Sequence, residues 1–189
     1  MLPEKYYETC ITYHIVRYFE QSRIGKIYPF TISQVQEKSY GYDFAYPLGN
    51  GHIFYIQFKR PNGLSVENSM MAWSVEMVQL ETIIKNGIGS CTYYALPEFD
   101  DIFEWYSGLE KTCFISADDL YTQIRLKRKI RQHAVLINSK KWRLKRFGDY
   151  FPQEISFRNV LATDESEEPC DRKMKIPGEN FRGFYLEYA

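Results

Sequence analysis

Polar side chains that could do chemistry interrupt two hydrophobic stretches of the chain. In HIFYIQFKRPNG, residues 52–63, Gln57 and Lys59 stand two positions apart. Because side chains alternate between the faces of a strand, both would project from one surface while bulky apolar side chains fill the other. An ammonium group at the end of such a run is costly to desolvate unless it meets water or an anion. The pattern predicts either an amphipathic strand with one wet face or a polar site.

A carboxylate that such a lysine could meet lies in the preceding stretch, YGYDFAY, residues 40–46. If this stretch is a strand, Asp43 shares its face with Gly41 and Ala45. These two small residues would leave open space above the carboxylate. The opposite face would then carry the aromatic residues Tyr42, Phe44 and Tyr46.

The turn between the two stretches, Gly49-Asn50-Gly51, is a strong hairpin signal. Antiparallel pairing across it would bring Asp43 into one site with Gln57 and Lys59. A second acid, Glu37, precedes Asp43 by six residues and could lean over the same place.

Two carboxylates, an amide oxygen and an ammonium group are suited to metal-assisted hydrolysis of a phosphodiester. Hard divalent cations such as Mg²⁺ prefer oxygen ligands, and they lower the pKa of a bound water. A neighbouring lysine can position that water and stabilise the transition state electrostatically. We therefore expect a Mg²⁺ or Mn²⁺ site and four catalytic residues, of which the first three would be metal ligands: Asp43, Glu37, Gln57 and Lys59.

The periodicity of the surrounding chain predicts a mixed α/β fold. The expected elements are a helix over residues 4–21, strands over 39–48 and 52–60, a helix over 69–86 and a strand over 91–96. Beyond them we expect a helical turn within 31–38, a helix capped by Ser116, a hairpin over 133–147, a polar loop over 163–173 and a last strand over 181–188.

Asp43 in GYD, the hairpin and the IQFK segment together resemble the PD-(D/E)xK nuclease superfamily, which has the restriction-endonuclease-like fold. IQFKR is most similar to the QxK variant of Mrr-type restriction endonucleases. The resemblance spans residues 1–97 and implies a nuclease core there, built on a mixed sheet flanked by helices. Residues 98–189 would then be a C-terminal α+β elaboration packed on the same domain.

The sequence departs from the superfamily pattern at two positions. Tyr42 replaces the usual proline, which we regard as harmless. Gln57 replaces the usual acid, so the site loses one negative charge and one strong ligand. The superfamily also takes an acid from an early helix, which makes Glu8 the rival of Glu37 for the second carboxylate. We favour Glu37 because it lies closer to Asp43 in the sequence.

Charge is distributed unevenly along a chain in which 24 basic residues balance 24 acidic ones. Residues 125–146 contain no acid and interleave cations with His133 and Trp142, a composition typical of either a solvated face or a nucleic-acid surface. The expected nucleic-acid contacts are Arg125, Lys127, Arg128, Lys129, Arg131, Lys140, Lys141, Arg143, Lys145 and Arg146.

Three functions are compatible with these features. The first is a metal-dependent nuclease acting on DNA, which fold analogy would make a homodimer. The second is a catalytically degraded nuclease fold that binds nucleic acid or a partner within a defence or mobile-element system. The third is an interaction protein with a tyrosine-rich surface. No signal-peptide or transmembrane pattern is present, so we expect a cytoplasmic protein without membrane contact.

Overall fold

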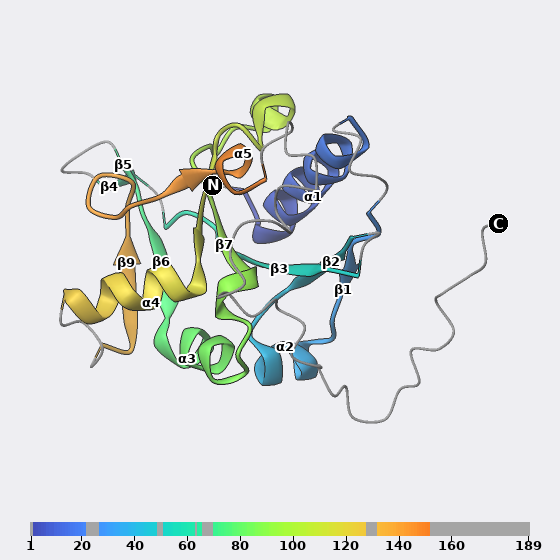
Figure 1. Ribbon diagram of the computed structural model, residues 1–189. Helices are drawn as coiled ribbons and strands as arrows, with labels where there is room; N and C mark the ends of the chain where they lie inside the picture. Colours follow the sequence, from blue (N-terminus) through green and yellow to red (C-terminus); the bar gives the residue numbers. More distant parts are fainter. Residues whose placement is uncertain are drawn as a thin grey trace.

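The computed structural model describes residues 2–21, 27–48, 51–62, 64–65, 70–127 and 132–151 (Figure 1). The polar loop expected over 163–173 and the last strand expected over 181–188 lie outside the described residues. So do three of the expected nucleic-acid contacts, Arg128, Lys129 and Arg131.

A six-stranded mixed sheet forms the centre of the molecule, with the strand order β1-β2-β3-β7-β8-β10. Its strands are β1 (Phe30–Thr31), β2 (Phe44–Pro47), β3 (Ile53–Phe58), β7 (Thr92–Pro97), β8 (Thr112–Ser116) and β10 (Lys145–Arg146). β3 and β7 are parallel, and every other neighbouring pair is antiparallel. The expected mixed α/β architecture is therefore confirmed.

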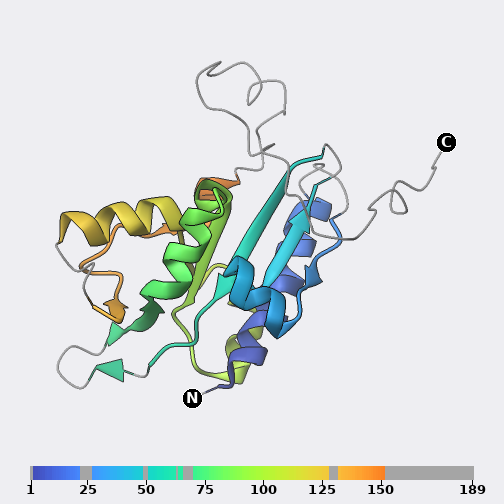
Figure 2. The same ribbon diagram turned by 90° about the horizontal axis from the view of Figure 1, so that it is seen from below.

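Helices cover both faces of this sheet (Figures 1 and 2). One face carries α1 (Glu4–Gln21), and the other carries α3 (Met77–Lys85) and α4 (Ala117–Leu126). The shorter helical segments are α2 (Gln34–Tyr40), α5 (Phe147–Tyr150) and the 3₁₀ turns η1 (Gly89–Cys91) and η2 (Ile102–Ser107). Two small ribbons complete the described part: β4 (Leu64–Ser65) with β5 (Met70–Met71), and β6 (Trp73–Glu76) with β9 (Ala134–Ile137).

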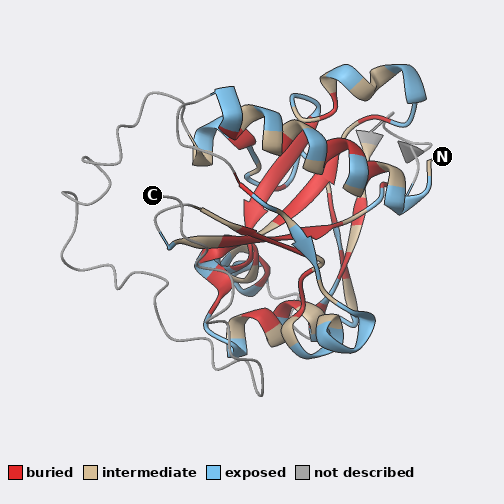
Figure 3. Ribbon diagram, turned by 90° about the vertical axis from the view of Figure 1, so that its right-hand side faces the viewer, coloured by how far each residue is buried: buried red, intermediate tan, exposed pale blue. Residues whose placement is uncertain are grey.

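Two hydrophobic cores result, one on each face of the buried strands (Figure 3). Alternation along β3 divides its side chains between them. Phe54, Ile56 and Phe58 pack against α1, whereas Tyr55 packs on the side of α3 and α4. Gln57 therefore projects toward the α3 side of the sheet.

Several local expectations are confirmed at the level of individual residues. The first helix spans Glu4–Gln21, and β2 and β3 form the expected hairpin, with Phe44 opposite Ile56. Ser116 caps α4 by accepting a hydrogen bond from the Asp119 N–H. These features depend on local sequence, which explains why periodicity and capping rules find them.

The helix expected over 69–86 is wrong in its first half. Residues 73–76 form β6, and the helix begins only at Met77. Trp73 and Val75 are buried while the residues beside them are not, which is a period of two. Trp73 and Met77 also fit a helical spacing of four, so the apolar stripe was open to both interpretations.

The hairpin expected over 133–147 is also wrong. β9 pairs with β6, so that Val135 lies opposite Val75, and β10 pairs with β8, so that Lys145 lies opposite Phe114. The two strands thus join different sheets. Long-range partners from earlier in the chain replace the local pairing that the short polar turn suggested.

Candidate functional site

The backbone that carries Asp43 is positioned by a helix end. The strand expected to begin at Ser39 starts only at Phe44, because α2 continues through Tyr40. Gly41 ends the helix with φ +86°, and its N–H donates to the Glu37 carbonyl at 2.6 Å. A Cβ on Gly41 would lie 2.7 Å from the Ile83 Cγ1. Glycine at this position therefore permits both the turn and the close approach of α3.

The turn also changes which face Tyr42 occupies. Tyr42 was expected beside Phe44 and Tyr46, but it packs in the other core, with its ring centroid 4.3 Å from that of Tyr55. The reason is that residues 41–43 precede the strand and do not follow its alternation. Asp43 is thus held at the mouth of the hairpin rather than within the pleat.

Asp43 and Gln57 are in direct contact across this hairpin. The Gln57 Nε2 donates a hydrogen bond to the Asp43 Oδ2 at 2.8 Å, and the Phe58 N–H donates to the same oxygen at 2.7 Å. The Asp43 N–H in turn donates to the Ile56 carbonyl at 3.0 Å. Both bonds to the carboxylate end on Oδ2, so Oδ1 is left to other partners.

Three further charged groups lie close enough to act on the Asp43 carboxyl. Burial, with smaller contributions from the acids Glu37 and Glu8, raises the pKa of Asp43 to about 7, although the Phe58 N–H and the Lys59 ammonium oppose the shift. Lys59 and Glu37 are both half-buried. The hairpin and α2 thus gather Asp43, Lys59 and Glu37 in one neighbourhood.

Glu8 enters the same neighbourhood from α1, but it already has a partner. The Lys5 ammonium lies 2.5 Å from the Glu8 Oε2. Glu37 also contributes more than Glu8 to raising the pKa of Asp43. Glu37 thus remains the predicted second acid beside Asp43, with Glu8 as its rival.

The amide of Gln57 is oriented with its nitrogen toward Asp43. Besides its bond to Asp43, Nε2 donates to the Phe58 carbonyl at 3.2 Å. The oxygen Oε1 is buried without a hydrogen-bond partner in a side chain that is only 2% exposed. Such an oxygen is costly to leave unsatisfied, so this atom fits a bound cation or water.

Sequence reasoning missed Tyr94, whose hydroxyl is also buried and unpartnered. Tyr94 lies directly beside Gln57 in the parallel pair of β3 and β7. The Tyr93-Tyr94 pair in an apolar strand gave no signal of a polar role, and the pairing that brings it to Gln57 is not local.

Within the described residues, no three His, Cys, Asp or Glu side chains form a group that could hold a metal ion. A cation at this site would therefore depend on one or two carboxylates supplemented by the Gln57 amide and water. Mg²⁺ is often bound in this way, because it keeps several of its waters. The donor set fits a hydrated divalent cation of modest affinity.

The described cations of the 125–146 segment are all exposed, and several of them have partners of their own. Lys127 lies over the Trp142 ring at 5.1 Å and Lys145 over the Tyr150 ring at 5.0 Å. Arg146 donates to the Glu98 Oε2 at 2.8 Å, and Arg125 lies over the Tyr121 ring. The remaining three cations with described positions are Lys140, Lys141 and Arg143.

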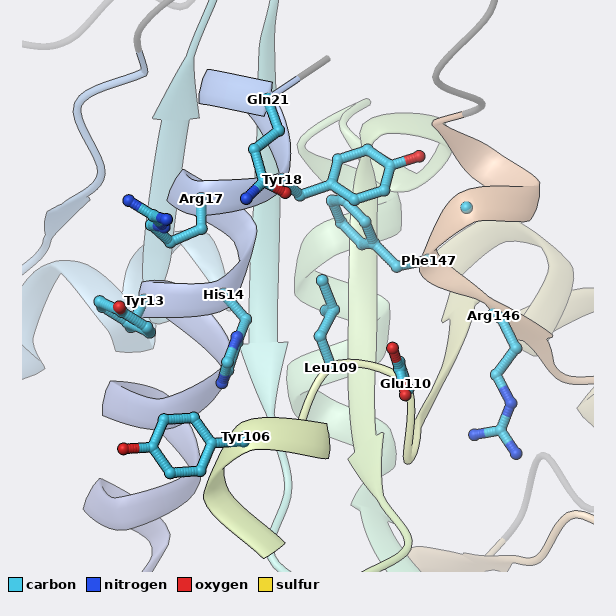
Figure 4. A pocket seen from close by; sticks show the side chains of 11 residues that line it. Tyr13, His14, Arg17, Tyr18, Gln21, Tyr106, Leu109, Glu110, Arg146 and Phe147 are labelled. Atoms are coloured by element: carbon cyan, nitrogen blue, oxygen red, sulfur yellow. The ribbon is translucent and has the colours of Figure 1, made fainter.

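A hollow of about 600 Å³ lies elsewhere, between α1, the segment after η2 and the start of α5 (Figure 4). Arg146 lines it together with Tyr13, Arg17 and Tyr106. Asp43, Gln57, Lys59 and Glu37 are not among its lining residues. This hollow and the Asp43 neighbourhood are therefore separate features of the surface.

No protein-family model matches the chain, and no curated protein matches it. Among solved structures, the chain is similar to D212, a nuclease from a fusselovirus, with a TM-score of 0.55 and 12% sequence identity. The match covers 85% of this chain and 98% of the viral one. The mixed sheet flanked by helices is therefore a fold that a nuclease also adopts.

In the part of the chain that the structure describes, no helix has both the length and the apolar character needed to cross a bilayer.

Proposed function

We propose that the protein is a metal-dependent nuclease that hydrolyses phosphodiester bonds in DNA, with a QxK form of the PD-(D/E)xK site. The observation that carries this proposal is the 2.8 Å contact between Asp43 and Gln57 at the mouth of the β2–β3 hairpin. It occurs in a fold similar to that of a nuclease, with Lys59 and Glu37 gathered around the same carboxyl.

The proposed roles follow from the chemistry of each group. Asp43 and Glu37 would hold Mg²⁺ or Mn²⁺, and the buried Gln57 Oε1 would assist as a neutral donor. When bound, the cation would supply a water of lowered pKa and offset negative charge on the phosphate. Lys59 would orient the attacking water and stabilise the transition state.

The remaining expectations stay part of the same proposal. Residues 1–97 would supply the catalytic core and residues 98–189 an elaboration that contacts DNA through the cations of segment 125–146. The protein would act as a cytoplasmic homodimer, because cutting both strands of a duplex requires two sites. The homodimer rests on fold analogy, whereas the DNA contacts rest on the charge pattern of the segment.

Cleavage of a supercoiled plasmid in the presence of Mg²⁺, Mn²⁺ or EDTA tests the proposal. We expect nicked and linear products only with a cation, and a loss of at least about a hundredfold in Asp43→Asn and Lys59→Gln. Glu37→Gln should lose more activity than Glu8→Gln. An exposed acid outside the site, altered in Glu81→Gln, provides the control. Cleavage that survives in Asp43→Asn would refute the assignment.

A catalytically degraded nuclease fold is the second candidate. Two observations support it. The Gln57 amide nitrogen donates a hydrogen bond to the Asp43 Oδ2, and the described residues contain no group of three His, Cys, Asp or Glu side chains that could hold a metal ion. For such a protein we expect DNA binding that weakens as the salt concentration rises. We expect no cleavage at any concentration of Mg²⁺ or Mn²⁺. A single pair of assays, plasmid cleavage and DNA binding, thus separates the two candidates.

A further inference from the structure

Tyr94 lies beside Gln57 in the sheet, and Gln57 is the residue that hydrogen-bonds to Asp43. Tyr94 pairs directly with Gln57 across the parallel strands β3 and β7, so both side chains project from the same face of the sheet. The Tyr94 side chain is fully buried, with 0% exposed. Burial, and after it the carboxylates of Asp43 and Glu76, raise the pKa of Tyr94, so its hydroxyl keeps its proton and remains a donor.

Buried polar atoms without a partner are few in the described residues. The four side-chain atoms of this kind are Tyr7 Oη, Gln57 Oε1, Gln79 Oε1 and Tyr94 Oη. Two of them, on Gln57 and Tyr94, belong to adjacent paired residues. Gln79 belongs to the turn of α3 whose backbone approaches Gly41, two residues before Asp43. Two of the four atoms thus belong to the strand pair that carries Gln57.

The hydroxyl and the amide oxygen do not hydrogen-bond to each other, although they are chemically complementary. A phenol donates one hydrogen bond and an amide oxygen accepts, so a water between them would satisfy both groups. The Asp43 carboxylate lies beside the same amide. A water held at this position would therefore bind the side chain that also contacts Asp43.

We propose that Tyr94 is a positioning residue of the cation site: together with the Gln57 amide oxygen it holds a water that hydrates the divalent cation bound by Asp43. This inference rests on the proposed function. It explains how a site with glutamine in place of an acid binds a cation, since a hydrated ion needs donors and acceptors for its waters as well as charged ligands.

The test compares Tyr94→Phe with Tyr7→Phe. Tyr7 is the control because its side chain is likewise fully buried, but it belongs to α1 and the opposite core. Each variant loses one buried hydroxyl and no carbon atom. The two readouts are the MgCl₂ concentration for half-maximal thermal stabilisation and that for half-maximal plasmid cleavage.

We expect Tyr94→Phe to raise both midpoints by about tenfold, with a smaller effect on the cleavage rate at saturating MgCl₂. Tyr7→Phe should keep the midpoints of the unaltered protein. Equal midpoints in all three proteins would overturn the role of Tyr94 and leave the proposed nuclease intact. If the unaltered protein shows neither cleavage nor Mg²⁺-dependent stabilisation, both the role of Tyr94 and the proposed nuclease are overturned. A crystal structure showing a water within hydrogen-bond distance of Gln57 Oε1 and Tyr94 Oη would support the inference directly.

Discussion

Gln57 and Asp43 lie on opposite sides of the β2–β3 hairpin, and the Gln57 amide nitrogen donates to the Asp43 Oδ2 at 2.8 Å. An ionised acid at position 57 could not donate this bond, and two ionised carboxylates at that distance would repel each other. Glutamine therefore stabilises the metal-free site, at the cost of one anionic ligand for a cation.

Gln57→Glu should destabilise the metal-free site and strengthen cation binding. We expect the variant to melt at a lower temperature than the unaltered protein in EDTA, and the difference to be larger at pH 8 than at pH 5, where the acids are partly protonated. Addition of Mg²⁺ should stabilise the variant more than the unaltered protein, because a second carboxylate then faces the cation. Thermal melts with and without Mg²⁺ measure both effects. Equal responses to Mg²⁺ would argue against a cation near position 57.

Metal-free stability should depend on pH through Asp43. Burial raises the pKa of this carboxyl to about 7 in the folded chain, against 3.8 for the free group. The folded state then binds more protons than the unfolded state between these values. The contribution of Asp43 to stability is therefore greatest below pH 3.8, falls as the pH rises toward 7, and levels off above pH 7.

Denaturant titrations in EDTA between pH 4 and pH 9 measure this dependence. In Asp43→Asn the loss of stability with rising pH should be smaller, because the amide does not titrate. Asp100→Asn, which alters an exposed acid, should follow the unaltered protein. Parallel curves for the unaltered protein and Asp43→Asn would show that the Asp43 carboxyl is not strongly shifted.

Gly41 and Gly51 offer a matched pair of substitutions. Both have φ +86°, but a Cβ would meet Ile83 at Gly41 and nothing within 4 Å at Gly51. Gly51→Ala should therefore cost about 1 kcal/mol from backbone strain alone. Gly41→Ala should lower the free energy of unfolding by about a further 1–3 kcal/mol, because the added methyl group overpacks against Ile83. It should also reduce cleavage by displacing Asp43. Unfolding free energies from urea titrations provide the comparison, and equal losses would contradict the close approach of α3.

Reversing the charges of Lys141, Arg143 and Lys145 should weaken DNA binding and flatten its salt dependence. Each lost phosphate contact lowers the slope of log K against log [salt] by about 0.9. Replacing the same three residues by glutamine should give an intermediate loss, as expected for an electrostatic effect. Binding isotherms at several salt concentrations give the slopes. Unchanged affinity across them would exclude this segment from the DNA-binding surface.

The residues that could be anticipated from the sequence are those whose positions depend on local pattern. The Gly49-Asn50-Gly51 turn predicts the antiparallel pairing that brings Asp43 near Gln57, and the structure places these two residues in hydrogen-bond contact. Tyr94 could not be found in this way. Its place beside Gln57 depends on the parallel pairing of β3 with β7, which no short-range pattern encodes.

The failed expectations have the same physical origin. Trp73 and Val75 belong to a strand because Ile137 and Val135, more than fifty residues later, pair with them. Without that partner, the apolar spacing fits a helix equally well. The orientation of the Gln57 amide is a similar case, since it is decided by the acceptors on Asp43 and Phe58 rather than by residue type.

The order of strands in the central sheet has a practical consequence for making fragments of the protein. β7 lies between β3 and β8, so a polypeptide cut after Pro97 would expose the hydrogen-bonding groups along one side of a strand that is apolar on both faces. Exposed strands of that kind recruit other chains and precipitate. Recombinant fragments that contain residues 1–97 should accordingly also keep the segment that pairs β8 with β7.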